Sequence, residues 1–239
     1  MQNSYWEGSG KVILFLTLTF FLIYKQPNLG SALLILGIGI CMFICSGINI
    51  CILIKRGIIT SIIWMPAFYF LVKNGLSDVQ MARIRTVFNL FLDAKGDGYQ
   101  LVNSFIAIGS GGISGRGFGE SIQKDGFLPD PHTDFIMSII SEELGIIGVL
   151  IILIGISNVV LRSFKIAQQC KSQFGSHIAI GIGSMIGLQS IVNLGGVTGI
   201  FPLTGTPLPF ISFGGSSLMA NLMAMGILLN ISIFNKKNK

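Results

Sequence analysis

Ionisable side chains gather in residues 130–145, DPHTDFIMSIISEELG, at the start of a long apolar run. Asp134 is the candidate for chemistry, because a carboxylate at the boundary between water and lipid can accept the proton of a hydroxyl group. It could equally hold a divalent cation such as Mg²⁺ or Mn²⁺ beside a phosphate, and it is the metal ligand we predict. His132 has no companion His or Cys nearby, so the pattern disfavours zinc.

Simpler structural roles compete with chemistry for the same residues. Thr133 or Asp134 could cap the first turn of a helix, where a negative charge also suits the helix dipole. The neighbouring charged groups exceed what a cap requires. Glu142 and Glu143 lie deeper in the apolar run, where an ionised side chain is costly. Pairing with an arginine of an outer loop and a direct part in catalysis both stay open for these two glutamates.

The composition sets the environment in which these groups must work. The chain has 239 residues, of which 51% are hydrophobic and 11% charged, with a mean hydropathy of +0.75. These values indicate an integral membrane protein. We predict an all-α fold, a single membrane domain formed by a polytopic bundle of about six transmembrane helices. The expected spans are approximately residues 11–25, 30–54, 57–73, 133–162, 177–199 and 212–234.

The basic residues predict the orientation of the bundle. Most Lys and Arg side chains fall in the short loops and chain ends that would share one side of the membrane. The positive-inside rule therefore places both termini in the cytoplasm and residues 74–132 outside the cell. The charge of +6 reflects this topology rather than binding of nucleic acid, which is not an expected partner.

The large outer loop contains apolar and glycine-rich segments. Residues 84–92 carry apolar side chains at helical spacing, which predicts an amphipathic helix at the interface. Residues 101–108 are apolar but too short to span, and a run of glycines follows at 109–119. We predict a re-entrant or surface-hugging segment that ends in a tight turn. The order of the glycines does not match a phosphate-binding GxxxxGK[ST] loop, so nucleotide binding is disfavoured.

A second irregular segment lies at residues 201–215, FPLTGTPLPFISFGG, between two spans. Its prolines and glycines cannot continue a helix, so we predict an ordered lip on the outer side of the membrane. The lip would lie on the same face as Asp134. A groove between them, open both to water and to acyl chains, would suit a lipid-linked substrate.

Four motifs in the same order resemble the SEDS family (shape, elongation, division and sporulation), which includes RodA, FtsW and SpoVE. They are KQPNLGSALL (25–34), GDGYQLVNSFIAIGSGGISGRGFGESIQK (96–124), HTDFIMSIISEELGIIG (132–148) and PLTGTPLPFISFGGSSL (202–218). The resemblance implies a peptidoglycan glycosyltransferase that polymerises lipid II in the bacterial plasma membrane during elongation, division or sporulation. It implies that Asp134 is the essential acid. It also implies a class B penicillin-binding protein and other divisome or elongasome membrane proteins as partners.

Further side chains near the expected groove complete the predicted site. The expected substrate-binding residues are His132, Thr133, Arg83, Arg85, Gln123, Lys124, Ser212 and Ser216, with Asp130, Glu142 and Glu143 in supporting roles. The chain departs from the family pattern at Asn28, where the family often has Asp, and at Asp130, where it often has Glu. The shorter acid at 130 keeps the charge but not the reach.

The number of spans leaves two other functions open. The family has about ten spans, whereas about six are expected here, corresponding to the fifth through tenth. We therefore expect a truncated product, a fragment, or one half of a split protein. The alternatives to the polymerase are a lipid II flippase or transporter, and an inactive scaffold of the same family. Transport predicts ionisable groups at mid-membrane, whereas most acids here cluster outside.

Overall fold

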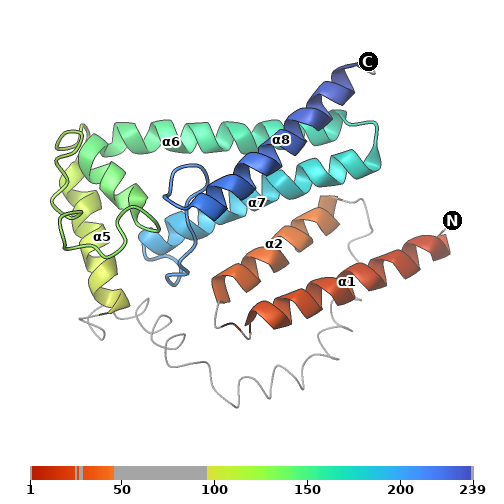
Figure 1. The fold of residues 1–239 in the computed structure, drawn as a ribbon, viewed down its shortest axis with the longest axis horizontal. Helices are drawn as coiled ribbons and strands as arrows, with labels where there is room; N and C mark the ends of the chain where they lie inside the picture. The colour runs from red at the N-terminus through yellow and green to blue at the C-terminus, as the bar shows by residue number, and fades with distance from the viewer. Residues whose placement is uncertain (1, 25, 27–28, 46–95, 238–239) are drawn as a thin grey trace, which may run out of the picture. The chain divides into compact units, whose positions relative to one another are not determined.

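The computed structural model describes residues 2–24, 26, 29–45 and 96–237 (Figure 1). Within these ranges every regular element is a helix, which confirms the all-α prediction. The chain divides into two compact units, residues 1–80 and residues 81–239. The single membrane domain stays a prediction.

The first unit contains a pair of packed helices, α1 (Gln2–Tyr24) and α2 (Leu29–Cys45). Gly39 of α2 faces Leu16 of α1 so closely that a Cβ would overlap the leucine side chain. The hydroxyl of Thr17 donates to carbonyls of its own helix, so it costs little in an apolar setting. The apolar stretches Val12–Ile23 and Gly30–Cys45 are shorter than a full span within the described residues.

The second unit contains α5 (Asp97–Gly111), α6 (Ile136–Gln169), α7 (Gln173–Val197) and α8 (Gly215–Lys237). The helices α6, α7 and α8 are each long and apolar enough to cross a membrane. Figure 1 shows α6 and α7 side by side, with α5 packed against the first part of α6. A small core of Leu128, Phe135, Ile139 and Val197 joins the end of the predicted outer loop to α6 and α7.

The helix α6 is broken at Gly145, which has φ 65° and ψ −163°. The break releases backbone groups that cannot stay unpaired in a membrane. The glycine loop, residues 111–119, supplies their partners. Its Arg116 and Gly117 amides donate to the carbonyls of Glu142 and Glu143, at 2.9 and 3.0 Å. On the other side of the break, the amides of Ile146 and Ile147 donate to the carbonyls of Gly112 and Ile113, at 3.1 and 3.4 Å.

This close approach explains three of the glycines. A Cβ on Gly111 would overlap the carbonyl of Ser141, and one on Gly115 would overlap the carbonyl of Glu143. Gly145 itself would meet the carbonyl of Ile113. The predicted tight turn is present, and its glycines allow the loop to lie against the broken helix backbone.

The helices of the second unit overlap the predicted spans with shifted ends. The predicted 133–162 corresponds to α6, which extends to Gln169. The predicted 177–199 and 212–234 correspond to α7 and α8. Residues 101–108 lie within α5, whose 15 residues are too few to span. The predicted span at 57–73 and the amphipathic helix at 84–92 lie outside the described residues.

Candidate functional site

Asp134 lies in a turn directly before α6, and it is half-buried. The N-cap residue of α6 is Phe135, which provides no side-chain cap. The hydroxyl of Thr133 donates to the carbonyl of Asp130 at 3.0 Å. The hydroxyl of Thr133 therefore stabilises the turn that precedes α6.

The backbone of residues 132–134, the HTD triplet, is held by hydrogen bonds at three successive carbonyls. Each donor comes from another part of the second unit. The donors to the carbonyls of His132, Thr133 and Asp134 are the amide of Phe213 at 2.8 Å, the hydroxyl of Ser212 at 2.6 Å and the side-chain amide of Asn193 at 2.9 Å. This arrangement fixes the position from which the Asp134 side chain projects.

The lip, residues 201–215, lies directly against the triplet. An ideal Cβ on Gly205 would be 3.5 Å from Oδ2 of Asp134, so the carboxylate is beside this part of the lip. Gly205 has φ 67°, a value that favours glycine. Ser212 also accepts from the Leu208 amide at 2.7 Å, which closes the lip on itself. The prediction that the lip and Asp134 share one face is therefore confirmed by their contacts.

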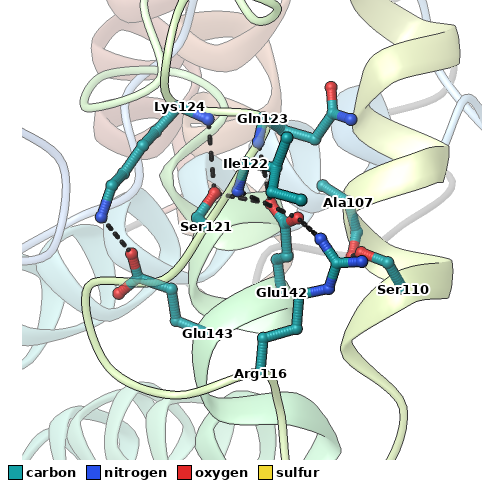
Figure 2. Close-up of polar contacts among 9 residues, drawn as sticks. All are labelled: Ala107, Ser110, Arg116, Ser121, Ile122, Gln123, Lys124, Glu142 and Glu143. Atoms are coloured by element: carbon teal, nitrogen blue, oxygen red, sulfur yellow. Dashed lines mark hydrogen bonds and ion pairs between the residues drawn. The ribbon is translucent and has the colours of Figure 1, made fainter.

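A second polar cluster surrounds Glu142, whose side chain is fully buried (Figure 2). Its carboxylate accepts from the hydroxyl of Ser121 at 2.5 Å and from the guanidinium of Arg116 at 3.2 Å. The backbone amides of Ile122 and Gln123 donate to it at 3.3 Å each. A buried carboxylate is tolerated when its acceptor sites are filled in this way. Glu142 thus ties the outer loop to α6, two turns below Asp134.

Glu143 forms its own ion pair on the same turn of α6. Its carboxylate lies 2.9 Å from Nζ of Lys124, which also donates to the carbonyl of Gly119. The hydrogen bond with Glu143 is the main cause that raises the pKa of Lys124 above its usual range. Both glutamates therefore have cationic partners in the loop before α6. Glu142 has an arginine, as the pairing alternative predicted, whereas the partner of Glu143 is a lysine.

The comparisons with known proteins cover almost the whole chain. A family model described as "Cell cycle protein", for FtsW, RodA and SpoVE, matches residues 1–237. The chain belongs to the FtsW/RodA/SpoVE family. A probable peptidoglycan glycosyltransferase FtsW from Bacillus subtilis is 48% identical over 226 residues, which cover 91% of this chain and 56% of that protein. Stage V sporulation protein E of the same organism is 41% identical over 217 residues, covering 91% and 57%.

Solved structures of the same family agree with this assignment. One, described as showing structural coordination of polymerization and crosslinking by a peptidoglycan synthase complex, matches with a TM-score of 0.67 and 26% identity. It covers 94% of this chain and 61% of that one. A mutant of the rod shape determining protein RodA from Thermus thermophilus matches with a TM-score of 0.59 and 26% identity, covering 93% and 56%. The chain thus spans somewhat more than half of these relatives, and it is a membrane protein like them.

The predicted site residues fall into two groups in this FtsW/RodA/SpoVE protein. The first surrounds Asp134 and includes Thr133, the exposed His132 and the buried Ser212. Asp130 is exposed, with φ 51°. Ser216 is exposed in the first turn of α8. The second group meets the two glutamates: the backbone amide of Gln123 donates to Glu142, and the Lys124 ammonium pairs with Glu143. Arg83 and Arg85 lie outside the described residues. Contact of any of these side chains with a substrate stays a prediction.

Sequence reasoning missed Asn193, Arg116 and Ser121. Asn193 is only 4% exposed within α7, and a buried amide in a membrane helix is itself a signal of function. The partners of Glu142 carried no local signal, because they lie about 20 or more residues away in the chain. Among the described residues, no group of three His, Cys, Asp or Glu side chains could hold a metal ion.

Proposed function

We propose that the chain forms the catalytic part of a peptidoglycan glycosyltransferase that polymerises lipid II. The observation that carries this proposal is the placement of Asp134, a half-buried carboxylate beside an ordered lip at the start of a membrane-length helix. The relatives named as glycosyltransferases support the reaction class. Because the chain spans somewhat more than half of those relatives, the activity, the substrate and the partners are proposals for this protein.

In the proposed reaction Asp134 acts as the general base. Its carboxylate takes the proton from the 4-hydroxyl of the acceptor sugar, whose oxygen attacks C1 of the donor sugar. The new β-1,4 bond forms as the bond between C1 and the diphosphate oxygen breaks. Undecaprenyl diphosphate leaves with the electron pair. The three hydrogen bonds to the HTD triplet would hold the base in place throughout.

A divalent cation at Asp134 stays part of the proposal. Mg²⁺ is commonly bound through one or two carboxylates together with substrate phosphates and water. Asp134 would be the carboxylate ligand. The cation would offset charge on the diphosphate. The residues of the chain would still have to position the acceptor hydroxyl.

We also propose the partner and the orientation. The partner would be a class B penicillin-binding protein, a transpeptidase that crosslinks the glycan strands. This is consistent with the peptidoglycan synthase complex among the structural neighbours. Both termini would face the cytoplasm of a bacterial plasma membrane, since the basic residues favour that side. Asp134 and the lip would then face the outer surface, where the sugars of lipid II are polymerised.

The experiment is a substitution of Asp134→Asn in the protein expressed from its native gene and purified with its transpeptidase partner. Polymerisation of labelled lipid II should fall by at least about a hundredfold, because general-base catalysis contributes roughly 10²–10⁴-fold. The control is Asp125→Asn, an exposed aspartate of the outer loop that should leave the rate unchanged. Normal polymer yield from well-inserted Asp134→Asn protein would refute Asp134 as the base, whereas absence of polymer from the well-inserted unmodified protein would favour the inactive scaffold.

The flippase alternative predicts a different result for the same proteins. A transporter would move labelled lipid II between leaflets of proteoliposomes without making polymer. The two glutamates of α6 do not support a transporter, because Glu142 is paired with Arg116 and Glu143 with Lys124 of the outer loop. Translocation without polymerisation in the unmodified protein would refute the polymerase and support the transporter.

A further inference from the structure

We infer that Asn193 is a positioning residue for the reaction, one that sets the place of Asp134 without touching substrate. This inference rests on the proposed function of Asp134 and adds a second residue to it. Asn193 lies near the end of α7, and its side chain is buried.

Asn193 makes two hydrogen bonds that join the two halves of the site. Its Nδ2 donates to the carbonyl of Asp134 at 2.9 Å and to the carbonyl of Thr206 in the lip at 2.8 Å. One amide group therefore uses both of its protons to connect the base and the lip to α7.

The orientation of this amide is fixed by chemistry. Rotating it by half a turn would place Oδ1, an acceptor, against two carbonyl oxygens, which are also acceptors. The oxygen instead lies on the other side, buried and without a hydrogen-bond partner among the described residues. A buried acceptor without a partner costs free energy, and the two bonds made by Nδ2 offset that cost.

The other donors to the HTD triplet belong to the lip, so they can move together with it. Ser212 and Phe213 bind the carbonyls of Thr133 and His132. Asn193 is the donor on the packed helix α7, and it also holds the lip itself. Without it, the triplet and the lip would lose their shared attachment to α7, and the Asp134 carboxylate would shift. A displacement of about 1 Å can cost about a hundredfold in rate.

The test compares Asn193→Leu with the unmodified protein in lipid II polymerisation. Leucine has a similar size and keeps the helix, but it donates to neither carbonyl. The expected result is a fall of about 10- to 100-fold in kcat, with the Kd for lipid II changed less than twofold. The matched control is Ser190→Ala on the same helix. Ser190 is buried, and among the described residues its hydroxyl bonds only the carbonyl of Ile186 in α7, so its loss should leave kcat unchanged.

A second comparison separates the position of Asp134 from general anchoring of the lip. Gln189, also on α7, donates to the carbonyl of Pro207 at 2.9 Å, so this bond reaches the lip and not the triplet. Gln189→Leu should therefore lower kcat by a smaller factor than Asn193→Leu. Equal losses in the two variants would overturn the inference, as would a kcat within twofold of the unmodified protein for Asn193→Leu.

Hydrogen exchange measured by mass spectrometry keeps the inference testable apart from activity. Asn193→Leu should speed exchange of the amides of Leu208 and Phe213, which are bonded within the lip and to the triplet. If leucine prevents folding, Asn193→Ser takes its place, since a serine hydroxyl is too short to reach both carbonyls. If the unmodified protein makes no polymer, the proposed function fails, while unchanged exchange at these amides would overturn the role of Asn193 itself.

Discussion

The break in α6 gives the sharpest stability prediction, because it depends on one backbone conformation. Gly145 has φ 65° and ψ −163°, a combination that is essentially restricted to glycine. Gly145→Ala would place a Cβ onto the Ile113 carbonyl and the Gly115 amide nitrogen of the glycine loop. Either the helix or the loop must move.

The magnitude follows from two contributions. The backbone conformation alone costs an alanine about 1–3 kcal/mol. Displacement of the loop would also weaken the four backbone hydrogen bonds that bridge the break, each worth about 0.5–1.5 kcal/mol. We expect a loss of about 3 kcal/mol or more in the free energy of unfolding if only part of this bridge is lost.

The assay is unfolding in detergent, followed by the change in helix content, for Gly145→Ala and for Gly155→Ala as its matched control. Gly155 lies on the same helix, and a Cβ there meets nothing within 4 Å. Its replacement should be neutral or stabilising by up to about 1 kcal/mol, since alanine favours a helix over glycine. Equal stability of the two variants would refute the argument that the glycine conformation maintains the break.

Two further predictions concern the glutamates of α6. Glu142→Gln should lower the free energy of unfolding by about 1–3 kcal/mol, because an amide cannot accept all four of the hydrogen bonds that the buried carboxylate accepts. Chemical unfolding measures this loss. An equal loss from the exposed control Glu120→Gln would contradict the prediction. Lys124 has a raised pKa in the folded state, chiefly through its bond with Glu143, so its contribution to stability is complete below the unfolded pKa of about 10.4 and disappears as the pH rises through the folded value. Melting temperatures of the unmodified protein and Lys124→Gln should therefore converge above that window, and a constant difference between them across it would argue against the pair.

The sequence predicted the parts of the site that depend on composition and order along the chain. Prolines and glycines between two apolar runs indicated an ordered lip, and the lip does contact Asp134 through Gly205. Because a charge in an apolar run is costly, the sequence indicated that Glu142 must pair with a cation or face the interior of the bundle. Which cation it has could not be predicted, because Arg116 is brought to it by the fold of the outer loop.

The break at Gly145 could not be predicted for a different reason. Apolar residues continue on both sides of it, so the pattern reads as one uninterrupted span. The glycines of the outer loop were recognised as a tight turn, but their role depends on where the helix opens. Only the three-dimensional arrangement pairs the loop carbonyls of Gly112 and Ile113 with the amides of α6.

The same physical requirement connects the break and the HTD triplet. Both are irregular backbone next to membrane-length helices, where each unpaired amide or carbonyl would be costly. At the break, the glycine loop supplies backbone partners on both sides. At the triplet, Ser212, Phe213 and Asn193 supply donors to three carbonyls in a row. These bonds fix the backbone from which the Asp134 side chain projects, so a substitution at Asn193 should lower the rate by moving this backbone.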